Sequence, residues 1–142
     1  MPRYWIMTPS MDWDDWNKDG IISLKWNLSK SYMDYTCDEL EKELKNMLRK
    51  YIDRMKQIVE FSKTMQIGDF IYLRKNDCII AYGKVTSDYI FDPDRQRKHI
   101  RKVEWISSGA WDIDKELPHK DLKDITDDPI KKAIMDVVFE KE

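Results

Sequence analysis

The sequence predicts an α+β domain in which a curled, partly barrel-shaped mixed sheet packs against a long helix and a C-terminal helix. Two observations predict this class. Apolar residues recur every three or four positions between residues 40 and 59, which is the spacing of one face of a helix. From residue 69 to residue 106 the spacing changes to alternation, which is typical of strands.

The N-terminal segment contains two predicted strands. "RYWIM", residues 3–7, is aromatic and β-branched and stops before Thr8 and Pro9, so we expect a first strand there. "IISLKW", residues 21–26, follows Gly20 and has the composition of a second strand. We expect a loop to about Asp19 between them, because the stretch lacks the apolar period of a helix.

The central segment predicts one long amphipathic helix. Thr36 and Glu39 have the spacing of a capping box, in which each side chain bonds the other residue's backbone N–H at the start of a helix. The apolar stripe that follows predicts a helix to about Lys63, with this stripe in the core. The stripe consists of Leu40, Leu44, Met47, Leu48, Tyr51, Ile52, Met55, Ile58 and Val59.

The C-terminal half predicts further strands and a closing helix. Residues 69–74 and 78–86 are expected strands, joined by "KND" as a hairpin turn. After the loop "DPDRQ", residues 99–106 form another expected strand, with alternate residues on one face. This face carries His99, Arg101, Val103 and Trp105. Asp128 and Pro129 are residue types that begin a helix, and the apolar stripe after them predicts a short one.

Composition limits the class of protein. A chain of 142 residues is long enough for one core, so we expect a single domain over residues 1–142. It contains no run of about 20 apolar residues and no signal core at the N-terminus, which favours a cytoplasmic protein without membrane contact. Cys37 and Cys78 stand in no metal-binding spacing, so we expect reduced, buried thiols and no zinc.

The stretch "DWNKDGIISLKW", residues 15–26, resembles part of a calcium-binding loop. Asp15, Asn17, Asp19 and Gly20 occupy positions 1, 3, 5 and 6 of such a loop. Position 12 requires a glutamate, and Trp26 stands there without an oxygen ligand. The stretch is therefore interpreted as a solvated acidic loop, and neither a metal ion nor another cofactor is expected.

Basic and aromatic residues point to a binding function instead. The formal net charge is −2, so nucleic-acid binding requires a local patch. "RQRKHIRK", residues 95–102, contains no acidic residue and is the candidate patch. Six Trp and seven Tyr are more than a core of this size ordinarily uses, so we expect several at a binding surface.

Several segments together resemble one superfamily. The stretch "GDFIYLRKNDCIIAYGKVTSDYIFDPDRQRKHIRKVEWI", residues 68–106, contains a Gly-Asp strand opener, the strand "YGKV", the aromatic "SDY" and the strand "HIRKVEW". With "RYWIM" and "DGIISLKW" it resembles the PUA-like superfamily, over about residues 3–120. The similar branch contains EVE domains, YTH domains and the N-terminal DNA-reading domains of McrB-type restriction systems, and the last are the closest resemblance.

The resemblance implies an aromatic cage that accepts one flipped base, often a methylated one. Stacking on aromatic walls contributes about 1 to 3 kcal/mol per base. By position, Trp26 and Tyr89 would be two walls, and Trp16 or Trp13 a third; core packing is the alternative for Trp26 and Tyr89. Base-edge contacts would come from Ser10, Asn27, Ser87 or Asp88, and phosphate contacts from Arg95, Arg97, Lys98 and Arg101. Lys25 departs from the small residue expected beside the tryptophan.

We therefore expect a nucleic-acid-binding reader domain that is not an enzyme, since no nucleophile, acid pair or metal cluster has supporting spacing. Modified DNA is slightly favoured over RNA as its partner, and a separate effector protein is a further expected partner. The alternatives are a PUA-like domain that binds RNA, and a module of the same fold for a small aromatic ligand or a protein partner. A structural role ranks third.

Overall fold

The structure is a computed structural model that describes residues 1–9, 12–45 and 51–140. Along the chain it contains these elements: β1 (Tyr4–Met7), α1 (Trp13–Asp19), β2 (Ile21–Ser23), the 3-10 turn η1 (Tyr32–Asp34), α2 (Cys37–Lys45), α3 (Tyr51–Val59), the π-helical turn η2 (Glu60–Thr64), β3 (Phe70–Lys75), β4 (Cys78–Val85), β5 (Ile90–Phe91), β6 (His99–Asp112), β7 (Leu122–Asp124) and α4 (Pro129–Glu140). Within these ranges, no helix combines the length and the apolar character needed to cross a membrane.

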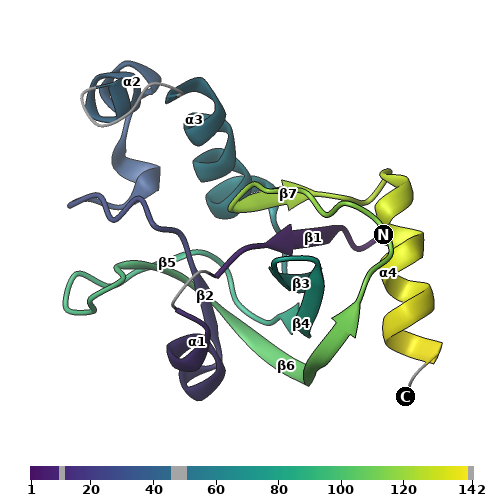
Figure 1. The fold of residues 1–142 in the computed structure, drawn as a ribbon. Coiled ribbons are helices and arrows are strands. Elements are labelled where there is room, and N and C mark those ends of the chain that lie inside the picture. Colours follow the sequence, from purple (N-terminus) through teal and green to yellow (C-terminus); the bar gives the residue numbers. More distant parts are fainter. Residues whose placement is uncertain (10–11, 46–50, 141–142) are drawn as a thin grey trace.

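The strands form a curled mixed sheet, as the sequence predicts (Figure 1). The strand order is β2-β6-β4-β3-β1-β7, and β5 pairs with β6 beside this path. β1 pairs with β3 in parallel, and the other pairs are antiparallel. The β4–β6 ladder shifts register between Ile79 and Ala81 and again between Tyr82 and Gly83. Such irregularities increase strand twist and bending, which accounts for the curl of β6 in Figure 1.

The two faces of the sheet bury different cores. Trp5 and Met7 of β1 belong to one apolar cluster, together with residues from α1, α2 and α3. Ile6, between them, belongs to a second cluster that includes Ile130 and Ile134 of α4. Because successive side chains of a strand point to opposite faces, this division places α4 on the face away from α1 and α3. Figure 1 shows α4 on that far side.

Helices differ from the sequence prediction in two places. Residues 13–19, expected in a loop, form α1, which ends at Gly20 with φ of 65° and a bond from the Gly20 N–H to the Trp16 carbonyl of 2.9 Å. The expected single helix to Lys63 is divided into α2, α3 and the turn η2, and α2 and α3 point in different directions in Figure 1. The predicted capping box is confirmed, since the Glu39 N–H donates to Thr36 Oγ1 and the Thr36 N–H to Glu39 Oε1, both at 3.1 Å.

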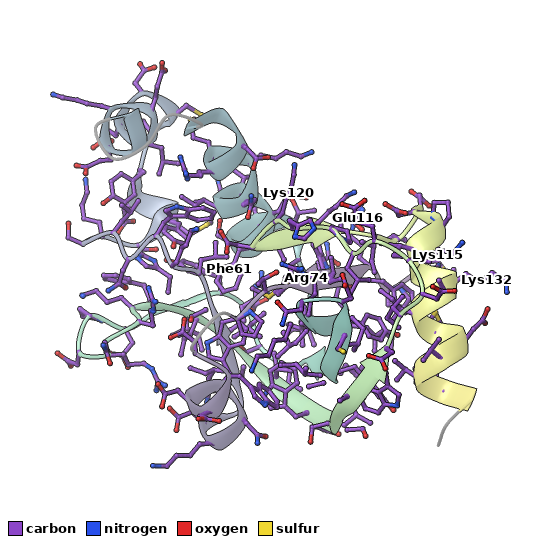
Figure 2. All side chains as sticks on the ribbon, viewed as in Figure 1. Phe61, Arg74, Lys115, Glu116, Lys120 and Lys132 are labelled. Atoms are coloured by element: carbon purple, nitrogen blue, oxygen red, sulfur yellow. The ribbon has the colours of Figure 1, made fainter. Side chains whose placement is uncertain are left out.

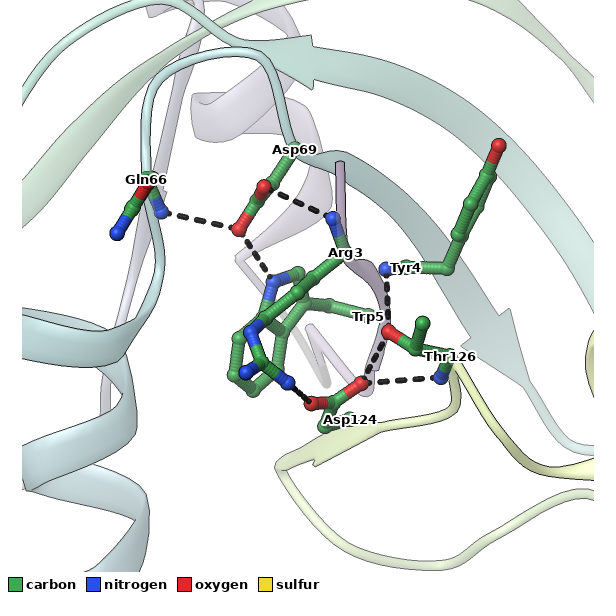
Figure 3. Close-up of polar contacts among 7 residues, drawn as sticks. All are labelled: Arg3, Tyr4, Trp5, Gln66, Asp69, Asp124 and Thr126. Carbon is green, nitrogen blue, oxygen red and sulfur yellow. Dashed lines mark hydrogen bonds and ion pairs between the residues drawn. The ribbon is translucent and has the colours of Figure 1, made fainter. Parts of the chain in front are cut away.

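Asp69 fixes β1 to the beginning of β3 (Figure 3). Its buried carboxylate accepts hydrogen bonds from the Trp5 indole at 2.9 Å, the Gln66 N–H at 2.9 Å and the Arg3 N–H at 3.0 Å. Three charge-assisted bonds make burial of this charge tolerable. Asp69 of the Gly-Asp pair noted in the sequence therefore has a structural role: it holds β1 against the beginning of β3.

The free thiols lie nearer the surface than predicted. Cys37, the first residue of α2, is exposed, and Cys78 at the start of β4 is half-buried. The Cys78 thiol donates to the Asp112 carboxylate on the neighbouring strand β6. The expectation that both thiols are buried is thus corrected, because each cysteine stands at the end of an element.

Candidate functional site

A cavity of about 320 Å³ lies between α1 and the loop that joins β5 to β6, and we call it the α1 cavity. It is lined by Asp12, Asp15, Trp16, Asp19, Ile21, Ser23, Arg95, Gln96 and Arg97. A smaller hollow of about 90 Å³ adjoins it, shares Asp12, Trp16, Ser23 and Arg97, and reaches Lys25 and Asp121. The volume of the α1 cavity lies at the lower end of the range found for small-ligand sites, which starts at about 300 Å³.

Trp16 is held rigidly as part of the cavity wall. Its side chain is 2% exposed, and its indole N–H donates to Ser23 Oγ at 2.9 Å. The Trp105 indole N–H donates to the Trp16 carbonyl, also at 2.9 Å, which ties α1 to β6. α1 therefore packs its single buried side chain on the sheet and turns its polar face toward the cavity.

Two ion pairs cross the α1 cavity from the β5–β6 loop to the α1 segment. Arg95 lies 3.0 Å from Asp19, and Arg97 lies 3.3 Å from Asp12. Arg97 also donates to the Lys25 carbonyl at 3.2 Å. The third carboxylate of the lining, Asp15, has no arginine partner among the described residues. Since the pairs are partly exposed, each contributes little to stability, typically below about 1 kcal/mol.

Asn27, predicted to contact a base edge, holds the β5–β6 loop instead. Its amide Nδ2 donates to the Gln96 carbonyl at 2.6 Å, and its Oδ1 accepts from the Lys98 N–H at 2.8 Å. The side chain therefore positions Gln96 and its arginine neighbours in the wall. Lys98 is not one of the residues that line the α1 cavity.

Trp26, the first predicted wall of the cage, is part of the core. Its side chain is 4% exposed and lines neither the α1 cavity nor the smaller hollow beside it. Its carbonyl accepts the Tyr32 hydroxyl, while its indole N–H is buried without a partner among the described residues. The predicted role for Trp26 is therefore corrected to core packing, because residues from several elements cover its ring.

Tyr89, the second predicted wall, belongs to a stack of three rings. The Tyr32 ring stacks on the His99 ring with centroids 3.7 Å apart, and it lies nearly parallel to the Tyr89 ring, whose centroid is 5.4 Å away. The Tyr89 hydroxyl accepts the Tyr32 N–H at 2.9 Å and lies 2.6 Å from His99 Nδ1, whose Nε2 lies 2.7 Å from the Leu28 carbonyl. A carbonyl only accepts, so Nε2 carries the proton and Nδ1 accepts from Tyr89. Burial lowers the pKa of His99 to about 4, which keeps the ring neutral.

Tyr89 and Trp26 therefore do not face each other across a slot. Half-buried Tyr89 lines a different hollow of about 630 Å³, where Asp88 and Arg101 are also found. Ser87, beside them, accepts the Lys102 N–H at its hydroxyl and donates that hydroxyl to the Asp88 carbonyl, both at 2.8 Å. The two-ring cage expected from the resemblance is replaced by two separate hollows.

Arg101, predicted to bind phosphate, stabilises a helix end. Its side chain is 2% exposed, and Figure 2 shows the position of Phe61 at the end of the α3 segment where it binds. The guanidinium donates to the carbonyls of Phe61 at 2.6 Å, Met65 at 2.6 Å, Ser87 at 2.9 Å and Ser62 at 3.4 Å. Three of these carbonyls, those of Phe61, Ser62 and Met65, lie at the end of the π-helical turn, and a cation there satisfies them. Arg101 is therefore removed from the predicted phosphate-binding set.

The remaining predicted residues are dispersed. Trp13, at the start of α1, is half-buried and packs edge to face on Trp105, with centroids 5.1 Å apart. Ser10 lies outside the described residues. Of the predicted set, the α1 cavity brings together Trp16, Arg95 and Arg97.

Sequence reasoning missed Ser23, Asp12 and Asp19 as site residues. Ser23 is a single polar residue between apolar neighbours in "IISL", and its 4% exposure shows that it is buried. A lone hydroxyl in an apolar strand was the available signal, because buried polar groups require partners. In the described part of the chain, no group of three metal-ligating side chains is placed to hold an ion.

Comparisons with known proteins agree with this fold. A family model described as "Domain of unknown function (DUF8426)" matches residues 8–127. The solved Mmi1 YTH domain superposes with a TM-score of 0.52 at 12% identity, covering 99% of this chain and 77% of that chain. A structure of the YTH domain-containing protein mmi1 in complex with RNA gives 0.50 at 13% identity, covering 99% and 85%. No curated protein sequence matches. The likeness confirms the predicted PUA-like fold of YTH type, while the closer resemblance to McrB-type domains stays a prediction.

Proposed function

We propose that this chain, which belongs to the DUF8426 family of domains of unknown function, is a nucleic-acid reader domain. It takes one base of the nucleic acid into the α1 cavity. One observation carries the proposal. Trp16 lies about 80 residues before Arg95 and Arg97 in the sequence, yet all three, which the sequence predicts as binding residues, line one cavity of suitable size. The YTH-like fold supports it, since one similar structure holds RNA.

The lining favours recognition by polar contacts and guanidinium stacking. Trp16 and Ile21 offer limited apolar surface, because both are at least nine-tenths buried. Ser23 and Gln96 offer a hydroxyl and an amide to the edge of a base. Arginine side chains stack their planes on bases as aromatic rings do, so Arg95 and Arg97 supply the faces that the expected cage lacks.

Phosphate contacts require the arginines to exchange partners. Arg95 and Arg97 are paired with Asp19 and Asp12, so a phosphate competes with a carboxylate for each guanidinium. A guanidinium can bind a phosphate through two parallel hydrogen bonds. Release of counterions from the strand also favours binding. The domain therefore binds a nucleic-acid strand and catalyses no reaction on it. The affinity is modest and depends clearly on salt concentration.

Binding measurements decide whether the strand is RNA or DNA and whether its recognised base is methylated. Single-stranded RNA and DNA of the same sequence, each with and without one methylated adenine or cytosine, are titrated against the protein. We expect tighter binding of a methylated strand and a steep loss of affinity between low and moderate salt. Equal affinity for methylated and unmethylated strands would remove the modified base from the proposal and leave nucleic-acid binding intact.

The variant for this assay is R95A/R97A, with K132Q as the control. Lys132 lies on α4, away from the cavity, and pairs only with Asp136 among the described residues (Figure 2). The double variant is expected to lose at least about tenfold in affinity and about two from the slope of log affinity against log salt. Wild-type affinity in R95A/R97A would contradict the assignment of this cavity.

A small polar ligand is the alternative, favoured by the three aspartates in the lining. Asp15 in particular has no arginine partner among the described residues and would attract a cationic group. Binding of such a ligand would change little with salt compared with a polyanionic strand. The salt series above therefore separates the two functions.

A further inference from the structure

A second cavity of about 530 Å³ lies on the other side of the N-terminal turn of α1, beside the β3–β4 hairpin, and we call it the hairpin cavity. It is lined by Thr8, Pro9, Trp13, Asp14, Arg74, Lys75, Asn76 and Ile80. The smaller hollow described above shares Thr8 and Pro9 with it, and shares Asp12 and Trp16 with the α1 cavity. The smaller hollow therefore has lining residues in common with both cavities.

Trp13 offers a fixed flat ring in this cavity. Its side chain is half-buried, so part of the indole reaches solvent. The ring meets Trp105 at 89°, and Trp105 is itself tied by its N–H to the Trp16 carbonyl. Packing on an anchored neighbour holds the Trp13 ring in place before any ligand arrives, which lowers the entropy cost of stacking.

The charge of the hairpin cavity is opposite to that of the α1 cavity. Arg74 is 8% exposed, donates to Thr8 Oγ1 at 3.2 Å and the Asn76 carbonyl at 2.9 Å, and pairs with no described carboxylate. Lys75 is exposed at the hairpin and also has no ion-pair partner among the described residues. Against these two cations stands one carboxylate, Asp14. The hairpin cavity therefore favours an anion, which it need not take from an existing pair.

We propose that the hairpin cavity is a second nucleotide subsite, in which a base adjacent to the one in the α1 cavity stacks on Trp13 and its phosphate contacts Lys75 and Arg74. This inference rests on the proposed function and extends it from one base to a short strand. A flat ring beside uncompensated cations is the combination that binds single strands with little sequence preference. The α1 cavity then selects the base, and the hairpin cavity adds affinity and orientation.

The test compares a mononucleotide with a strand. Adenosine monophosphate and a five-residue oligoadenylate are titrated by calorimetry against wild type, W13A, W13F and K75Q, with K132Q as the charge control. W13A is expected to bind the mononucleotide as wild type does and the strand roughly 5- to 100-fold more weakly. W13F keeps a ring and should retain most of the strand affinity. K75Q should lower the salt slope of strand binding by about one, and K132Q should not.

Three outcomes separate this proposal from the function on which it rests. If wild type binds neither probe and none of the methylated strands above, the reader function fails and this subsite fails with it. If wild type binds both and W13A binds the strand unchanged, only the hairpin subsite is overturned. If W13A loses both probes equally while its thermal midpoint falls, the ring has a structural role alone, which also overturns the subsite.

Discussion

The guanidinium of Arg97 lies 3.3 Å from the carboxylate of Asp12, and this pair joins the β5–β6 loop to the beginning of α1 across the α1 cavity. Arg95 and Asp19 make a parallel connection at the other end of the helix. The basic run is therefore engaged by the acidic segment of the same chain. A nucleic acid meets arginines that are already occupied, which sets the direction of the first prediction.

Removing the competing carboxylates is expected to tighten binding. In D12N the side chain of Arg97 loses its carboxylate partner but stays in the cavity wall, and in D19N the same holds for Arg95. A phosphate then no longer competes with a carboxylate for the guanidinium. A partly exposed pair is worth up to about 1 kcal/mol, so we expect an increase of roughly two- to fivefold in oligonucleotide affinity. D15N is the matched control, because Asp15 lines the same cavity without an arginine partner among the described residues. Equal gains in D12N and D15N would mean that net charge alone is responsible.

Replacing Arg101 is expected to destabilise the fold. R101K keeps a charge but cannot reach the four carbonyls that the planar guanidinium joins, and unsatisfied buried groups are costly. We expect a loss of about 3 kcal/mol or more in the free energy of unfolding, measured in urea. K102Q, at an exposed position of the same strand, should change it by less than about 0.5 kcal/mol. A stable R101K with a reduced salt slope would return Arg101 to the phosphate-binding set.

Stability is expected to fall in mild acid because of His99. Its pKa in the folded protein is about 4, below the ordinary value of 6.5, so the unfolded chain binds the proton more tightly. The contribution is complete above pH 6.5 and is lost progressively as the pH falls toward 4. Unfolding in urea at several pH values measures it. H99Q should flatten the curve over this range, whereas H119Q, at an exposed position, should leave it unchanged. A wild-type curve that is flat from pH 6.5 to pH 4 would contradict a neutral buried ring.

Substitution of Trp26 is expected to affect stability and not binding. W26A removes a buried ring and should lose about 3 to 5 kcal/mol. W26F should lose much less, because it keeps most of the apolar surface and removes an indole N–H that has no described partner. Oligonucleotide affinity of folded W26F should equal that of wild type. Weak binding by a W26F protein of full stability would place Trp26 in the site after all.

The sequence predicts most of the strands and the C-terminal helix, because alternation and helix-start residues are local signals. It misses α1, whose seven residues bury Trp16 alone and so show no apolar period. It also misses β5 and β7, which have two and three residues and are defined by their pairing partners. Short elements are fixed by tertiary contacts that a local window does not contain.

The candidate site, too, could be predicted only where the signal is local in the sequence. The residue types, aromatic and basic, are visible in the sequence, and Trp16, Arg95 and Arg97 do meet in the α1 cavity. Which tryptophan lines a cavity depends on neighbours across the sheet, so Trp26 could not be separated from Trp16 by its surroundings in the chain. The pairing of Arg97 with Asp12 spans 85 positions and has no local signature.

The place of β1 between β3 and β7 has a consequence for synthesis of the protein. Met7 pairs with Leu73 on one side and with Leu122 on the other, so β1 acquires its second neighbour only after residues 122–124 have been synthesised. Until then one edge of β1 stays open to unrelated chains. Expression fragments that stop before residue 122 should therefore accumulate as aggregates, whereas the chain of residues 1–142 should stay in the supernatant.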